Sequence, residues 1–124
     1  MDVTPLISKD LNYITSYNST GFRINEEWVD GSLILTSTIM KNWDCLAIDH
    51  IQMKDFDTVD ASKHPEVILL GTGKVFKPLS QEIANNLIKK NIFVEVMDTS
   101  AACRTYNVLL SAGRNVLAML IQAK

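Results

Sequence analysis

Hydrophobic positions in the second half of the chain occur in three short, nearly unbroken runs. These runs are residues 67–70, 92–97 and 116–121. Continuous apolar runs of this length are typical of strands that are covered on both faces. We therefore predict that the three runs are neighbouring strands of one central sheet.

Two segments with helical spacing separate these runs. In the first, apolar residues recur on one helical face, namely Leu79, Ile83, Leu87 and Ile88. In the second, the predicted apolar face comprises Ala102, Cys103, Tyr106, Leu109 and Leu110. The order β-α-β-α-β predicts mostly parallel pairing with right-handed crossovers.

Residues at the ends of the two segments have the chemistry of helix caps. Ser80 is suited to cap the first helix, and Asp98 or Thr99 the second, because their side-chain oxygens accept from free backbone N–H groups. Asn91 and Gly113 follow the predicted C-terminal ends, where a left-handed residue commonly stops a helix.

The first half of the chain has weaker patterning. Residues 1–20 are polar and predict an N-terminal extended arm with little regular structure. Alternation at residues 22–24, apolar residues on both sides of a turn at Asp30-Gly31, and residues 43–48 predict further strands. Residues 54–61 predict one or two helical turns.

No linker, repeat or low-complexity tract divides residues 21–124. We therefore predict a single three-layer α/β domain with a central mixed sheet over this range.

Composition limits the class of partner and the compartment. The 124 residues carry a net charge of -2 with scattered lysines and arginines, which argues against a nucleic-acid partner. The first residues do not resemble a signal peptide, and no apolar run is long enough to span a bilayer, so we expect a cytoplasmic protein without direct membrane insertion. Cys45 and Cys103 show no metal-ligand spacing and are expected to be reduced thiols.

The turn Gly71-Thr72-Gly73 is the first candidate site. Glycines between a strand and a helix allow backbone N–H groups to approach an anion closely. A dinucleotide fingerprint would need a glycine where Phe76 stands, and a Walker A loop would need Ser or Thr after Lys74. A structural turn that needs positive φ is the favoured interpretation, and no cofactor is predicted.

The second candidate site is the turn that contains Asp98 and Thr99. Turns after parallel neighbouring strands meet at the carboxyl edge of the sheet, so this turn and Gly71-Thr72-Gly73 are expected to border a shared crevice. Arg104 is a candidate anion contact, while Tyr106 and Asn107 either line the crevice or organise the turns by hydrogen bonds. His50 and His64 fit no metal spacing, so no metal site is predicted.

Several of these residues belong to blocks that resemble a known family. The first block is Leu70-Gly71-Thr72-Gly73 followed by Pro78, and the second runs from Val94-Glu95-Val96-Met97-Asp98-Thr99 through Thr105-Tyr106-Asn107 to Gly113-Arg114. They resemble the Mth-type domain-of-unknown-function family, which includes mitochondrial complex I assembly factor 3 and an adipogenesis-associated cytosolic protein. The resemblance implies a three-layer domain with no established enzymatic activity, and the mitochondrial relative implies a role in the assembly of membrane protein complexes through protein contacts. Because its first residues do not resemble a mitochondrial leader, the chain is expected to be a bacterial, cytoplasmic member.

Two functional hypotheses follow. In the first, the chain is a non-enzymatic binding or assembly module that recognises a protein partner, with homo-oligomerisation as a further option. In the second, it binds a polar or anionic small molecule, or is an enzyme, at the crevice between the Gly71 and Asp98 turns. A large exposed apolar patch would favour the first hypothesis. A pocket that holds Asp98, Tyr106 and Arg104 together would favour the second.

Overall fold

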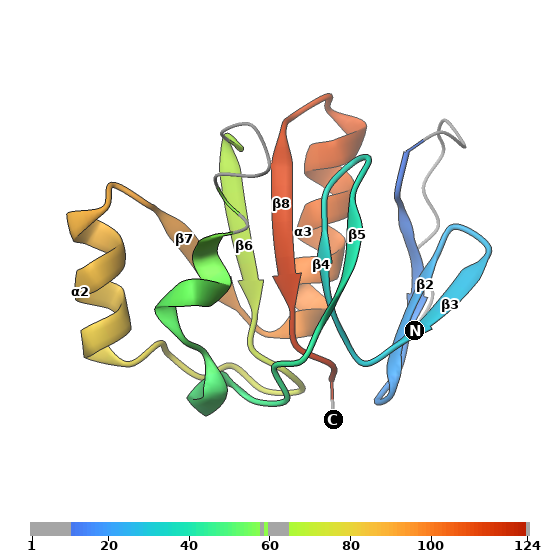
Figure 1. Cartoon of the computed structure of the whole chain (residues 1–124). Helices are drawn as coiled ribbons and strands as arrows, with labels where there is room; N and C mark the ends of the chain where they lie inside the picture. Colours follow the sequence, from blue (N-terminus) through green and yellow to red (C-terminus); the bar gives the residue numbers. More distant parts are fainter. Residues whose placement is uncertain (1–10, 58, 60–64, 124) are drawn as a thin grey trace.

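A computed structural model describes residues 11–57, 59 and 65–123 of the chain (Figure 1). Its elements in chain order are β1 (Ile14–Tyr17), β2 (Gly21–Ile24), β3 (Glu27–Asp30), β4 (Ser32–Leu35), β5 (Met40–Trp43), the 3-10 turns η1 (Ile48–His50) and η2 (Met53–Asp57), β6 (Val67–Gly71), α2 (Gln81–Lys89), β7 (Val94–Met97), α3 (Thr99–Ser111) and β8 (Val116–Leu120).

The central sheet has five strands in the order β5-β4-β8-β6-β7. β6 lies between β8 and β7 and runs parallel to both, while β4 is antiparallel to β8 and β5. The prediction that the three apolar runs are neighbours in one mixed sheet is therefore confirmed, as is the β-α-β-α-β order of the C-terminal half.

Both faces of this sheet are covered, which explains why its central strands lack polar alternation. Along β8, Val116, Ala118 and Leu120 belong to the core on the α3 side. The intervening Leu117 and Met119 belong to a second core, which α2 and the segment with the 3-10 turns cover from the other side. These two cores and the sheet between them form the predicted three-layer α/β architecture (Figure 1).

A smaller antiparallel sheet, β1-β2-β3, completes the layer that contains α3. The prediction of little regular structure in residues 1–20 is wrong for Ile14–Tyr17, which form β1. Residues 1–10 lie outside the described part of the chain. The polar composition was misleading because β1 obtains its order from partners elsewhere: β2 pairs along it, and Tyr13 and Ile14 are buried against the core of the α3 layer.

The helix ends follow the predicted capping chemistry. The Ser80 hydroxyl accepts from the Ile83 amide at 3.2 Å, and the Asp98 carboxylate accepts from the Ala101 amide at 2.9 Å. Asn91 and Gly113 both have positive φ, at 62° and 76°, after the helices end. One helical-face prediction is wrong, because Ile88 is 62% exposed while its neighbour Leu87 is buried.

Two boundaries in the first half also differ from the sequence prediction. The strand predicted over residues 43–48 is instead β5, which ends at Trp43. Its partner β4 begins at Ser32, which pairs with Trp43. The preceding Gly31 turns the chain at a φ of 86°. The predicted helical turns at 54–61 are seen as η2, and residues 58, 60 and 61 lie outside the described residues.

Helix α3 holds β1 in place through two polar side chains. The Asn107 amide oxygen accepts from the Ile14 amide at 3.0 Å, and its nitrogen donates to the Ile14 carbonyl at 2.7 Å. The Tyr106 hydroxyl donates to the Asn12 carbonyl at 2.7 Å. Asn107 therefore serves β1 as a neighbouring strand would, by satisfying both backbone groups of one residue.

We expect Asn107→Leu to lower the free energy of unfolding by roughly 1–3 kcal/mol, because both buried backbone groups of Ile14 lose their partner. Urea denaturation of the variant beside the wild type measures this change. Asn85→Leu, at an exposed position of α2, is the matched control and should change stability little. An unchanged midpoint for Asn107→Leu would contradict the role of this side chain in holding β1.

Candidate functional site

The turns that follow β6 and β7 lie side by side at the carboxyl edge of the sheet. The Thr72 amide donates to the Met97 carbonyl, and the Thr99 amide donates to the Gly73 carbonyl, both at 2.9 Å. The Gly73 amide donates to the Thr99 hydroxyl at 2.8 Å. The structure therefore brings together the five predicted site residues of the two turns, which are Gly71, Thr72, Gly73, Asp98 and Thr99.

Thr99 is the centre of this junction. Its side chain is 0% exposed, and its hydroxyl donates to the Ile121 carbonyl at 2.6 Å while accepting from Gly73. Gly71 permits the close approach, because a Cβ there would lie 2.8 Å from the Thr99 hydroxyl and 2.9 Å from the Thr99 Cα. Gly73 has a φ of 111°, a conformation that glycine adopts without strain.

Hydrogen bonds within the protein occupy several N–H groups of the Gly71 turn. Those of Thr72 and Gly73 donate to Met97 and Thr99, and that of Lys77 donates to the Thr72 hydroxyl at 3.1 Å. An anion cradle needs N–H groups that point at the ligand. These three N–H groups therefore have a structural role, while ligand binding at the junction stays a prediction.

A small cavity opens beside the Gly71 turn. Its volume is about 100 Å³, and its lining includes Thr72, Gly73, Lys74, Lys77 and Gln122 but not Asp98. A cavity of this size holds a few water molecules.

The other three predicted site residues have separate partners. Arg104 is exposed and donates from Nη1 to the Ser100 hydroxyl at 2.6 Å, one turn along α3. Tyr106 and Asn107 bond to the segment that contains β1. Burial raises the pKa of Tyr106 well above its usual value, so its hydroxyl stays protonated at neutral pH. The Asp98 carboxylate bonds instead to the Ala101 amide and caps α3.

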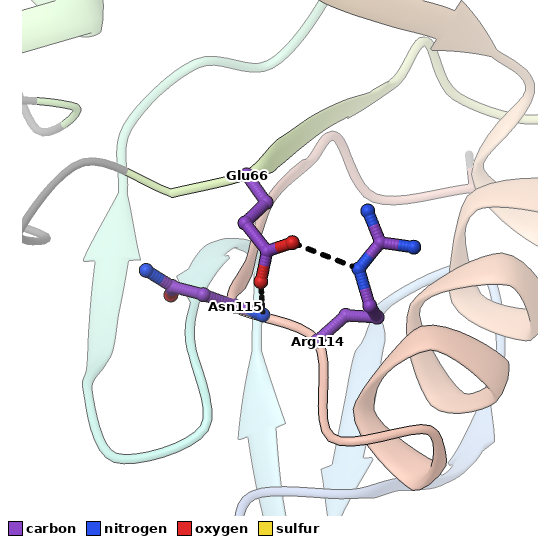
Figure 2. Close-up of polar contacts among 3 residues, drawn as sticks. All are labelled: Glu66, Arg114 and Asn115. Atoms are coloured by element: carbon purple, nitrogen blue, oxygen red, sulfur yellow. Dashed lines mark hydrogen bonds and ion pairs between the residues drawn. The ribbon is translucent and has the colours of Figure 1, made fainter.

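Arg114 lies at the opposite end of the sheet, just before β8 begins. Figure 2 shows its guanidinium beside Glu66, which precedes β6, with 3.0 Å between Nε and Oε2. The other oxygen of Glu66 accepts from the Asn115 amide at 3.1 Å. These two hydrogen bonds, that of Asn115 first, hold the pKa of Glu66 below its usual value. Arg114 thus joins the start of β8 to the start of β6, and it lies far from the Gly71 and Asp98 turns.

Both cysteines are free thiols in buried positions. Burial raises the pKa of Cys103 to about 12 and that of Cys45 to about 11. Such thiols are almost fully protonated at neutral pH and make poor nucleophiles. Among the described residues, no group of three or more His, Cys, Asp or Glu side chains is placed to hold a metal ion.

The sequence prediction missed an apolar groove between α2 and β7. Its volume is about 340 Å³, and its lining comprises Phe76, Pro78, Leu79, Ala84, Leu87, Ile88, Ile92, Phe93, Val94 and Val96. Three large side chains of the lining are mostly exposed: Phe76 at 57%, Ile88 at 62% and Phe93 at 72%. We call the surface formed by these three residues the α2–β7 face. A signal was available for two of them, since Ile88 follows the buried Leu87 and Phe93 lies between the partly buried Ile92 and Val94. Phe76 had no such signal, because the preceding Val75 is itself 56% exposed.

Comparison with solved structures places the chain among small α/β domains of one type. A crystal structure of a Bordetella parapertussis protein has a TM-score of 0.81 at 28% identity, and covers 94% of this chain and 99% of its own. A Bartonella henselae structure, described as an outer membrane protein, has a TM-score of 0.79 at 33% identity, and covers 90% and 95%. A Bordetella pertussis structure described as a Mth938-like domain shares the fold, with a TM-score of 0.79 at 23% identity.

The chain belongs to the family described as "Protein of unknown function (DUF498/DUF598)", whose model matches residues 14–121. The human protein named "NADH dehydrogenase [ubiquinone] 1 alpha subcomplex assembly factor 3" is 34% identical over 110 residues, covering 88% of this chain and 60% of its own length. The "13 kDa major membrane protein" of Francisella tularensis is 33% identical over 113 residues, covering 88% and 89%. This chain thus spans about three fifths of the assembly factor, and the predicted family resemblance is confirmed.

We expect Thr99→Val to lower the free energy of unfolding by roughly 1–3 kcal/mol. The substitution keeps the shape of the side chain but leaves the buried Gly73 amide and Ile121 carbonyl without their shared partner. Thr99→Ser keeps the hydroxyl and is the control, expected to retain more stability than the valine variant. Equal denaturation midpoints for the two variants would show that the hydroxyl does not stabilise the junction.

Proposed function

We propose that this chain is a non-enzymatic binding module that assists the assembly of a membrane protein complex by holding a protein partner. The proposal is supported by the similarity to an assembly factor named for an NADH dehydrogenase complex. That similarity alone does not identify the surface that acts.

The observation that carries the proposal is the α2–β7 face. Three large apolar side chains, Phe76, Ile88 and Phe93, are more than half exposed around one groove. Grouped exposed apolar residues commonly mark a surface that a partner covers, whereas single ones are normal on any protein. The face is also separate from the Thr99 junction, so a partner could bind without disturbing the contacts that hold the fold together.

The alternative, a polar ligand or a reaction at the crevice between the Gly71 and Asp98 turns, has less support. It would be favoured by a pocket that gathers Asp98, Arg104 and Tyr106, but these side chains bond to Ala101, Ser100 and Asn12 respectively. A binding role at the α2–β7 face is therefore the better-supported hypothesis.

We further propose that the protein is cytoplasmic and reaches membranes through its partner. Within the described residues, neither helix has the length and hydrophobicity that crossing a bilayer requires. Two relatives are described as membrane proteins, which fits peripheral attachment as well as it fits insertion.

Fractionation of native cells followed by a carbonate wash tests this location. We expect the protein to be released from membranes by the wash, because carbonate strips proteins held by protein contacts alone. A known integral membrane protein from the same cells is the control and should stay in the pellet. Recovery of the chain in the washed outer-membrane pellet would refute the proposed location.

Deletion of the gene followed by complementation tests the assembly role. We expect deletion to reduce an assembled membrane complex on native gels, the NADH dehydrogenase being the first to measure, and the wild-type gene to restore it. Phe93→Asp should restore it poorly, because a charge in the groove opposes apolar contact. Val108→Asp, at a 68% exposed position on α3, is the matched control and should restore assembly fully.

Assembled complexes that are unchanged by the deletion would contradict the proposed role. Equal complementation by Phe93→Asp and Val108→Asp would instead show that the assembly role does not depend on the α2–β7 face. Both substitutions replace exposed side chains, and a thermal unfolding measurement on each purified variant confirms that the fold is retained.

A further inference from the structure

The strand at the outer end of the central sheet has one open edge. β7 is last in the strand order and pairs with β6. On its other side, no further strand is present among the described residues. An edge strand presents backbone N–H and C=O groups that can pair with an additional strand.

The apolar groove lies directly at this open edge. One wall belongs to the edge strand, through Val94 and Val96, and the other belongs to α2, through Ala84 and Ile88. In Figure 1, α2 lies beyond β7 at the outer end of the sheet. An extended segment is the one regular structure that satisfies both features, since it pairs with the β7 backbone and directs alternate side chains at the α2 wall.

Charge around the groove indicates the chemistry of the partner. Residues 74–96 contain four lysines and two glutamates, a net charge of +2 in a chain whose total is -2. All four lysines are exposed, with Lys74 and Lys77 before α2 and Lys89 and Lys90 at its C-terminal end. The apolar groove is therefore flanked by basic groups at both ends of the helix, in a chain that is otherwise acidic.

The same charges argue against a second copy of this chain as the occupant. If β7 paired antiparallel with β7 of a second copy, the two α2 helices would lie in opposite directions. The lysines before α2 of one copy would then approach the lysines at the C-terminal end of α2 in the other copy. Like charges at an interface oppose association and disfavour the wrong partner. A bound segment with acidic residues at its two ends would be attracted by the lysines at both ends of α2.

We propose that a partner protein binds here by strand addition. An extended segment pairs with the open edge of β7, places apolar side chains in the groove between β7 and α2, and carries acidic residues at its two ends. This inference rests on the proposed binding function and specifies the kind of segment that is bound.

The test uses the full chain, isotopically labelled for NMR, and a synthetic peptide of alternating valine and threonine with aspartates at both ends. We expect the peptide to shift the amide resonances of residues 94–97. A version with lysines at both ends should bind at least about tenfold more weakly at low salt, and the difference should shrink as salt is added. A version N-methylated through its central residues keeps the side chains but cannot donate hydrogen bonds, and should not bind.

Protein variants provide the reciprocal measurement. Replacing Lys89 and Lys90 by glutamate should weaken the binding of the acidic peptide and strengthen the binding of the lysine-ended peptide. Lys41→Glu, on the strand at the other end of the sheet, is the control and should leave the affinity unchanged. These substitutions are at exposed positions, so the folded protein is retained for the comparison.

Four results would overturn strand addition at β7. The first three are equal binding of the N-methylated peptide, resonance shifts at β5 in place of β7, and no shifts at peptide concentrations of about 1 mM. The fourth is self-association of the free protein in sedimentation, with resonances of residues 94–97 that shift as the protein concentration rises. In each case the complementation experiment still decides the assembly role on its own, because it measures complexes in cells and makes no assumption about the binding mode.

Discussion

The close contact between the start of α3 and the ends of β6 and β8 is the constraint on which the rest of the structure depends. The Thr99 hydroxyl joins the turn after β6 to the chain after β8, and the missing side chain at Gly71 lets the helix approach to this distance. Because α3 also carries Tyr106 and Asn107, its position decides where β1 can pack. Helix α3 therefore links the two sheets, through Thr99 at its start to the central sheet and through Tyr106 and Asn107 to the segment that contains β1.

The two faces of the central sheet are closed to different extents. On the α3 side, the small sheet completes the layer and large side chains such as Tyr13, Phe22 and Tyr106 are almost fully buried. On the other side, α2 covers its part of the sheet but leaves Ile88 and Phe93 mostly exposed. The contacts by which Tyr106 and Asn107 hold β1 therefore lie on the α3 side, while the α2–β7 face lies on the other side of the sheet.

The extent of the family match agrees with this architecture. It begins at Ile14, the first residue of β1, and ends at Ile121, directly after β8. The small sheet is therefore part of the shared domain, although the polar composition of residues 1–20 predicts an arm. What the relatives share across this range is the fold.

Local patterns in the sequence determined the β-α-β-α-β half, because apolar runs and capping residues such as Ser80 and Asp98 act within a few positions of themselves. The meeting of the two turns followed from parallel topology alone. Only the tertiary structure decided the roles of Asn107 and Tyr106, whose partners lie more than 90 residues away in the chain. It also decided that Ile88 and Phe93 border a groove, because exposure depends on which neighbouring elements cover a side chain and periodicity does not record that.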